Sequence, residues 1–202
     1  MEWFSHFLNA SNHAPGAPVA EAIDYHYYAS PPSRTDVSTY SAMFGDADHW
    51  IEMYVKPAEV IRKRLSPSTK TYLKELGIIA PGDNNPAPGC APLPDLYWSA
   101  TAAYWAYLFS ELAMLEIDVV SMSQLVGGMP RNCVTLNGTA CTSHKGRACR
   151  CSGDNYPSVT MLDWKTGAPT ARWFVLKMLV DALGNRLKRL VPSSCTAGLC
   201  DR

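Results

Sequence analysis

The order of predicted elements restricts the fold of this chain more than any other feature of the sequence. Four stretches are predicted to be helical, at residues 1–10, 51–65, 95–115 and 170–183. Four shorter runs have the composition of strands, at residues 22–29, 70–79, 117–126 and 158–164. Strands that alternate with helices predict a parallel sheet covered by helices. The expected fold class is therefore α/β.

Composition narrows the class of protein. The chain has 202 residues, of which 47% are hydrophobic, and this is enough to bury the core of one domain. The 18 basic and 18 acidic residues give a formal net charge of zero, so the charge does not favour a nucleic-acid partner or an anionic membrane surface. The longest apolar run, residues 100–115, is interrupted by Ser110 and Glu111. We therefore expect no membrane span.

The seven cysteines indicate disulfides. Residues 129–156 form a cysteine-rich insertion with little apolar content. The candidates for disulfides are Cys133, Cys141, Cys149, Cys151, Cys195 and Cys200. A zinc site is the alternative, with ligands from Cys133, Cys141, His144, Cys149 and Cys151, but the spacing does not repeat the paired Cys-x-x-Cys of common zinc modules. Disulfides are favoured because the cysteines lie in predicted loops.

Disulfides form in oxidising compartments, so the cysteines indicate a protein of the secretory pathway. Two N-glycosylation sequons, at Asn9 and Asn137, indicate the same compartment. We therefore expect the parent protein to be secreted or lysosomal. The first eight residues contain no basic region and no small-residue cleavage site, so they are not a signal peptide. The secretory prediction thus requires that the natural start lies upstream.

Candidate site residues lie on two of the predicted strands. Glu75 comes near the end of the run 70–79, and a proline-rich loop at 80–94 follows. Barrel enzymes place catalytic carboxylates and substrate-binding loops at such strand ends, although a Glu there is more often a solvated rim residue. In the run 22–29, alternation places Asp24, His26 and Tyr28 on one face of the sheet. Ile23, Tyr25 and Tyr27 share the other face and are expected to pack.

At these residues the chain resembles the C-terminal half of a clan A glycoside hydrolase barrel, the superfamily of heparanase-like, β-glucuronidase and β-xylosidase enzymes. The run Ile23-Asp24-Tyr25-His26-Tyr27-Tyr28 looks like the sixth barrel strand. The run Thr71-Tyr72-Leu73-Lys74-Glu75-Leu76-Gly77 looks like the seventh, whose terminal Glu is the nucleophile. Residues 158–164, with Gly167-Ala168-Pro169 and Ala171-Arg172-Trp173, resemble the eighth-strand region.

The resemblance implies a partial (β/α)8 TIM barrel over residues 1–185, roughly strands six to eight with their helices, and a tail at 186–202. It implies a hydrolase that acts on an oligosaccharide or glycoside without a cofactor or metal. Glu75 would be its nucleophile, His26 and Tyr28 would bind that carboxylate or a sugar hydroxyl, and Gln124 and Trp164 would line the sugar subsite. The structural alternatives are a core histidine at His26, a strand cap at Gln124 and a core tryptophan at Trp164.

The chain departs from this family in one respect. The family's acid/base is a Glu usually preceded by Asn at the end of the fourth strand, and no Asn-Glu pair occurs in this sequence. A barrel usually needs about 250 residues, so strands one to five are expected to be missing. The simplest interpretation is a fragment that lacks its acid/base and is inactive alone, with an N-terminal half barrel as its partner.

Two other hypotheses remain open. The chain could be a non-catalytic secreted module, either a carbohydrate-binding remnant or a disulfide-stapled interaction protein built around residues 129–156. Glycan binding that survives Glu75→Ala but is lost when residues 129–156 are deleted would favour this hypothesis. The chain could also be a nonfunctional gene fragment, whose unpaired sheet edges would make it aggregate.

Overall fold

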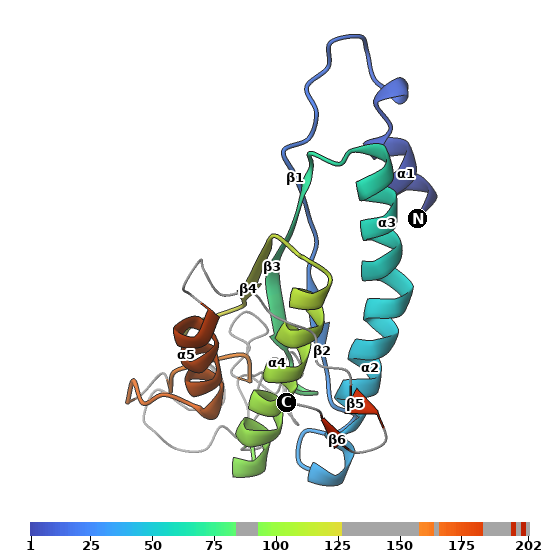
Figure 1. Cartoon of the computed structure of the whole chain (residues 1–202). Coiled ribbons are helices and arrows are strands. Elements are labelled where there is room, and N and C mark those ends of the chain that lie inside the picture. Colours follow the sequence, from blue (N-terminus) through green and yellow to red (C-terminus); the bar gives the residue numbers. More distant parts are fainter. Residues whose placement is uncertain (84–92, 127–157, 164–165, 184–194, 197–198, 201–202) are drawn as a thin grey trace, which may run out of the picture.

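A computed structural model describes residues 1–83, 93–126, 158–163, 166–183, 195–196 and 199–200 (Figure 1). It contains a parallel sheet with helices, which confirms the α/β class. Trp164 and the cysteines at 133, 141, 149 and 151 lie outside the described residues.

The sheet is centred on β3 (Lys70–Ile78). β1 (Ala22–Asp24) and β2 (Tyr27–Ala29) pair in parallel with one edge of β3 and are two parts of the single strand predicted at 22–29. β4 (Val119–Met122) pairs in parallel with the other edge. The strands therefore follow one another across the sheet in the order in which they occur along the chain.

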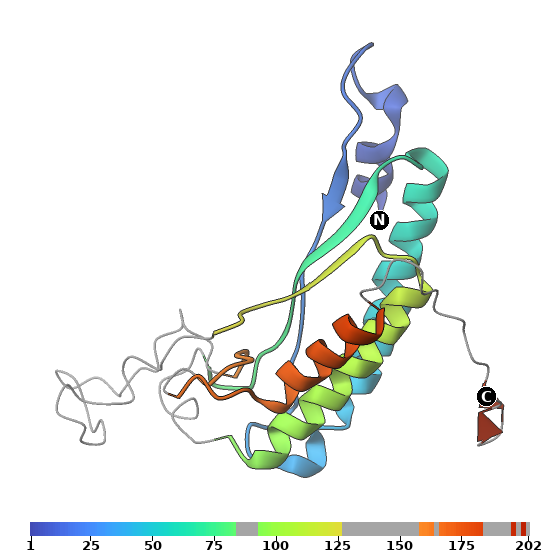
Figure 2. The ribbon, with the colours of Figure 1, turned by 60° about the vertical axis from the view of Figure 1, so that its left-hand side comes forward.

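The helices of the sheet region lie on one side of the strands (Figure 2). The connection from β2 to β3 contains α2 (Ala42–Trp50), the π-helical turn η3 (Ile51–Val55) and α3 (Lys56–Leu65). α4 (Asp95–Met114) follows β3, and α5 (Ala171–Leu183) packs on α4. Short helices complete the chain: α1 (Glu2–Leu8) against α3, η1 (Ala10–Asn12) and η2 (Val37–Thr39).

Pro57 is the second residue of α3, which directly follows the π-helical turn η3, a place where the regular helical hydrogen-bond pattern is already interrupted. The preceding turn is π-helical, and the N–H of Lys56 donates to the carbonyl of Ile51. The predicted helix 51–65 extends back to Ala42 without a break. The polar composition of residues 33–50 predicts a loop with possible helical turns, and residues 42–50 are helical instead.

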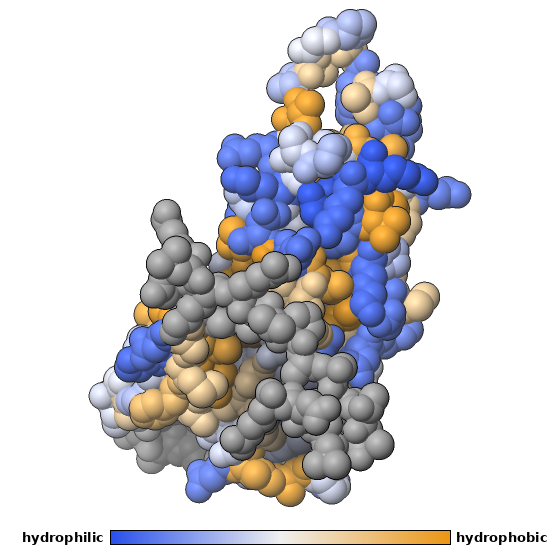
Figure 3. Space-filling view, viewed as in Figure 1, coloured by the Kyte–Doolittle hydropathy of each residue, from blue (hydrophilic) through white to orange (hydrophobic). Residues whose placement is uncertain are grey.

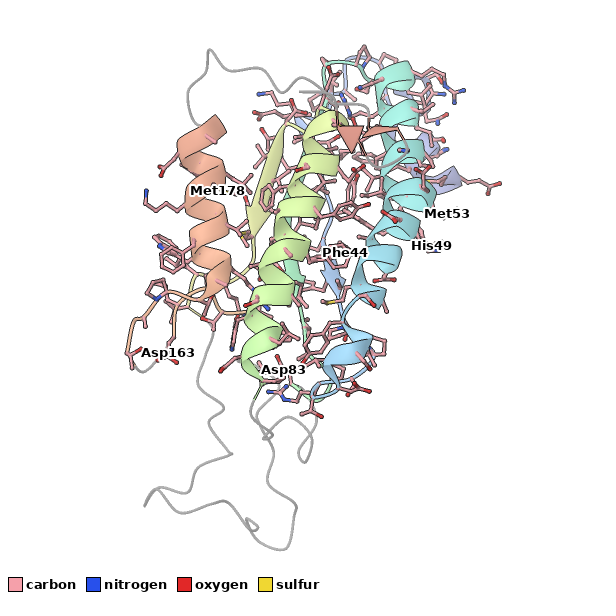
Figure 4. All side chains as sticks on the ribbon, turned by 60° about the horizontal axis from the view of Figure 1, so that its bottom comes forward. Phe44, His49, Met53, Asp83, Asp163 and Met178 are labelled. Atoms are coloured by element: carbon pink, nitrogen blue, oxygen red, sulfur yellow. The ribbon has the colours of Figure 1, made fainter. Side chains whose placement is uncertain are left out.

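The core lies between the sheet and α2, η3 and α4. Leu73, Leu76 and Ile78 of β3 are buried there, as are Tyr104, Leu108 and Leu112 of α4. Aromatic rings fill the remaining space. Tyr27 stacks on Trp50 at 4.1 Å between ring centroids, and Phe44 points from α2 to Tyr104 and Tyr107 of α4 (Figure 4).

Two tyrosines that are partly buried against this core, Tyr25 and Tyr27, predict a loss of stability at alkaline pH. Burial, and then the charge of Glu59, raises the pKa of Tyr25 above its ordinary value of 10.0. The folded state thus holds the phenol proton more tightly than the unfolded state, so its contribution is complete below pH 10 and is lost as the pH rises further. Burial raises the pKa of Tyr27 in the same direction.

We expect Tyr25→Phe to reduce this alkaline loss, measured as the difference in free energy of unfolding by urea between pH 8 and pH 11. The Tyr25 hydroxyl has no hydrogen-bond partner among the described residues, so its removal should change stability at pH 8 by less than about 1 kcal/mol. Tyr54→Phe removes a hydroxyl from a side chain that is 54% exposed and is the matched control. Equal alkaline losses in both variants would contradict the prediction.

Three sequence predictions about local structure are wrong. Residues 158–163 form no strand of the sheet, and Leu162 makes only an isolated bridge to Pro169. The strand that pairs with β3 on the edge opposite β1 and β2 is β4, which lies within the strand predicted at 117–126. Asp95 is a residue type that can cap the helix predicted at 95–115, but Pro94 is the N-cap residue of α4.

The third error concerns α5. The apolar spacing of residues 170–183 predicts a buried face that includes Phe174 and Met178, but these side chains are 58% and 55% exposed. The face that α5 turns inward instead carries Arg172, which donates to Thr101 of α4, and Val175, which packs against the core. Apolar side chains are consequently visible on the surface over α5 (Figure 3), and the exposed Met178 lies on this helix (Figure 4).

Two more predictions concern the tail and membranes. In the tail, β5 (Cys195–Thr196) and β6 (Leu199–Cys200) form an antiparallel pair in which Cys195 and Cys200 are register partners. A disulfide between them stays a prediction. No helix formed by the described residues is long and apolar enough to cross a membrane.

Candidate functional site

A bulge in β3 determines where Glu75 points. Between the Asp24↔Tyr72 and Tyr27↔Leu76 pairs, β3 uses one residue more than the strand opposite it. β4 shows the same excess, because Leu73↔Val120 is followed by Leu76↔Met122. An extra residue reverses the alternation of side chains. Glu75 therefore leaves the buried face of Leu73 and lies on the sheet face opposite the helices.

Glu75 meets two of the predicted site residues on that face. The Tyr28 hydroxyl lies 2.7 Å from Oε2 of Glu75 and donates to it. Nδ1 of His26 lies 3.4 Å from the same oxygen, and both side chains are about half exposed. No hydrogen bond to Oε1 of Glu75 is present among the described residues. One carboxylate oxygen is thus held and the other is available.

Gly77 allows Tyr28 to reach Glu75. Gly77 and Tyr28 are register partners, and the tyrosine ring lies over the glycine. A Cβ atom at position 77 would lie 2.5 Å from Cδ1 of Tyr28 and 3.4 Å from Cγ1 of Val159. The first separation is below 3.0 Å, which real Cβ contacts essentially never show. Gly77, two residues after Glu75, is therefore required because the Tyr28 ring occupies the space of a side chain at this position.

We expect Gly77→Ala to lower the free energy of unfolding by about 1–3 kcal/mol, as overpacking does, and to displace Tyr28 from Glu75. Gly45→Ala is the matched control, since nothing lies within 4 Å of its Cβ position in α2, and it should stabilise by about 0.5–1 kcal/mol. Urea unfolding measures both. Adding Tyr28→Ala should relieve most of the cost at position 77, and an additive double variant would contradict this explanation.

A pocket of about 560 Å³ adjoins the carboxylate. Its wall includes Lys74, Met122, Ser123, Gln124 and Val159. The predicted residues Glu75, Tyr28 and Gln124 are thus brought to one pocket, and His26 contacts Glu75 at its side.

Gln124 has a left-handed backbone with a φ of 58°, which is uncommon for a residue with a side chain. Its Oε1 atom is buried and has no hydrogen-bond partner among the described residues. Among the described residues this amide oxygen accepts no backbone N–H, so no hydrogen bond of a strand cap is present at Oε1. An unpaired acceptor in a pocket wall is suited to a ligand hydroxyl.

Sequence reasoning missed the residues that fix the far wall of this pocket, which we call the clamp: Arg34, Asp83, Ser158 and Arg172. Arg34 and Asp83 form a buried ion pair at 2.6 Å between Nη1 and Oδ1. Oδ2 of Asp83 accepts the Ser158 N–H at 3.1 Å and also binds the Ser158 hydroxyl. Nη1 of Arg172 donates to the Ser158 carbonyl at 2.7 Å. The clamp thereby holds Val159, the next residue, against Gly77.

The clamp lies where β3 ends and α4 begins, and Figure 4 shows Asp83 beside the first turn of α4. Tyr97 of that turn donates to the Ser158 carbonyl at 3.1 Å, and burial raises the pKa of its phenol. The Arg172 guanidinium lies 5.1 Å from the centre of the same ring. Two sequence signals could have indicated the clamp: the proline-rich composition of residues 80–94, and a single arginine, Arg172, at the start of a mostly apolar predicted helix.

The chain was compared with family models, curated proteins and solved structures, and none of them matches. Within the described ranges, no group of three His, Cys, Asp or Glu residues could hold a metal ion. A half-exposed carboxylate with one fixed oxygen, beside a pocket lined by hydroxyl, amide and ammonium groups, is suited to nucleophilic attack on a polar substrate.

Proposed function

We propose that this chain is the nucleophile-bearing part of a retaining glycoside hydrolase and that Glu75 is its nucleophile. The observation that carries the proposal is the asymmetric environment of Glu75. Tyr28 donates to Oε2, and Oε1, which has no hydrogen-bond partner among the described residues, is the oxygen that would attack the anomeric carbon. Such an attack forms a glycosyl ester on Glu75 and releases the leaving group.

The residues around Glu75 have distinct roles in this mechanism. After attack by Oε1, Oε2 becomes the carbonyl oxygen of the ester and still accepts from Tyr28, so the same hydrogen bond serves both half-reactions. His26, 3.4 Å from that oxygen, adds a second polar contact on the solvent side. Gln124 offers its unpaired amide oxygen to a sugar hydroxyl in the pocket.

The sheet supports a barrel segment as the setting. Three features agree with three successive strands of a (β/α)8 barrel, with β4 in place of residues 158–164 as the third: the strands are parallel, their order across the sheet follows the chain, and the helices among the described residues lie on one face (Figure 2). In a barrel the opposite face, which carries Glu75, would be the interior. The proposal includes a second carboxylate, the acid/base, on a further polypeptide segment that completes the barrel.

Covalent labelling tests the assignment of Glu75. 2-Deoxy-2-fluoroglycosyl fluorides trap the glycosyl ester, and their fluoride leaving group needs no acid catalysis. We would incubate a panel of these sugars with an extended polypeptide, in which this chain is joined to the segment proposed to complete the barrel, and with the present chain in parallel. Mass spectrometry of proteolytic peptides should find the adduct of one sugar on Glu75 of the extended protein.

Glu52→Gln serves as the control for labelling, because Glu52 is an exposed carboxylate on η3 that is outside the pocket. Labelling should be retained in this variant and lost in Glu75→Gln. An adduct on another carboxylate in the extended protein, with Glu75 unmodified, would refute the assignment. The present chain should hydrolyse none of the matching aryl glycosides.

A further inference from the structure

Ser123 holds Tyr28 in the orientation that Glu75 requires. Oγ of Ser123 lies 2.7 Å from the Tyr28 hydroxyl oxygen, and that oxygen is also 2.7 Å from Oε2 of Glu75. Ser123 was not among the residues predicted from the sequence. It lies just after β4, on the opposite side of β3 from Tyr28, so the three groups join three neighbouring strands of the sheet.

The number of protons fixes the direction of these hydrogen bonds. A phenol has one hydrogen, and an ionised carboxylate can only accept. When Glu75 is ionised, the Tyr28 hydrogen must therefore point to Oε2, and the bond to Ser123 is satisfied only if the serine hydroxyl donates. The chain of donors runs from Ser123 to Tyr28 to Glu75.

Backbone geometry places Ser123 for this purpose. The N–H of Ser123 donates to the Leu76 carbonyl at 2.8 Å, and Leu76 is the neighbour of Glu75 in β3. The next residue, Gln124, has the left-handed φ of 58°, so the chain leaves the sheet immediately after Ser123. Sparsely populated backbone conformations of this kind occur at functional sites and are maintained by their surroundings.

We infer that Ser123 is a positioning residue that directs the Tyr28 hydrogen to Oε2 and so leaves Oε1 of Glu75 as the attacking oxygen. This inference rests on the proposed function for its catalytic meaning, whereas the hydrogen-bond relay itself does not. A hydroxyl that accepts a hydrogen bond becomes a better donor, so Ser123 also strengthens the bond from Tyr28 to Glu75.

The relay is tested first without any substrate, in the present chain. The ¹³C resonance of the Tyr28 Cζ atom reports hydrogen bonding at the phenol oxygen and is assigned by its loss in Tyr28→Phe. We expect Ser123→Ala to shift this resonance and Ser123→Thr, which keeps a hydroxyl, to restore it toward the wild-type position. An unchanged resonance in Ser123→Ala overturns the relay.

The catalytic meaning is tested by the rate of fluorosugar labelling in the extended polypeptide. Ser123→Ala should slow labelling roughly tenfold, the lower end of the loss seen when a hydrogen bond that orients a metal-binding side chain is removed. Ser123→Thr should recover most of the rate. Because Ser123 acts through Tyr28, Ser123→Ala should have no further effect in the Tyr28→Phe background. Equal slowing in both backgrounds overturns the inference.

The two measurements separate the possible failures. A shifted Cζ resonance without any labelling of Glu75 would leave the relay standing and reject the glycosidase proposal. Labelling of Glu75 at the wild-type rate in Ser123→Ala would support the glycosidase proposal and reject Ser123 as a positioning residue.

Discussion

Asp83→Ala is expected to lower the free energy of unfolding by about 3–5 kcal/mol, the range observed when one partner of a buried ion pair is removed. Asp83 is fully buried, and Arg34, its partner at 2.6 Å, is only 7% exposed. The substitution leaves the guanidinium without its carboxylate. It also removes the acceptor of the Ser158 N–H, which is buried as well.

Asp181→Ala is the matched control, because it makes the same chemical change in an exposed ion pair. Asp181 pairs with Lys177 one turn earlier in α5, and both side chains are more than half exposed. The loss there should be no more than about 0.5 kcal/mol. Urea unfolding at pH 7 compares the two variants. A difference of less than about 1 kcal/mol between them would contradict the role assigned to the buried pair.

Most of the elements around Glu75 could be predicted from the sequence because their signals are local. Alternation in residues 22–29 correctly separated His26 and Tyr28 from Tyr25 and Tyr27, which contact Trp50 on the helix side. The apolar spacing of residues 95–115 correctly predicted α4. Each of these patterns reflects which side of a single element is buried.

The orientation of Glu75 could not be predicted in the same way. Strict alternation along β3 would place Glu75 on the buried face with Thr71 and Leu73. The bulge reverses this, and it is defined only by the pairing of β3 with strands on both sides. The sequence contains no turn residue at positions 74 and 75 that would signal it.

The clamp could not be predicted from the sequence either, because it also depends on contacts between distant segments. Asp83 and Ser158 are 75 residues apart, and both lie in loops, where no periodic pattern indicates burial. Polar residues in loops are ordinarily read as solvated, so a buried network of them is recognised only when its partners are placed together. The same holds for Ser123, whose role depends on Tyr28 across the intervening strand.

Glu75→Gln is expected to reduce kcat/KM of the extended polypeptide at least about a thousandfold toward the glycoside identified by labelling, given the large losses that follow removal of a nucleophile. The amide has nearly the shape of the carboxylate and can still accept from Tyr28, so the variant should fold with its site intact. What it loses is the negative charge on the attacking oxygen, without which no glycosyl ester forms.

The measurement is the initial rate with an aryl glycoside, and Glu52→Gln, which changes an exposed carboxylate on η3, should retain wild-type rates. Tyr28→Phe should be intermediate, with a loss of roughly ten- to a hundredfold, because it keeps the nucleophile and removes only the hydrogen bond to Oε2. If Glu75→Gln stays within about threefold of the wild type, a threshold far below the loss expected for a nucleophile, Glu75 does not form the covalent intermediate. The carboxylate would then be a rim residue that Tyr28 and His26 merely stabilise.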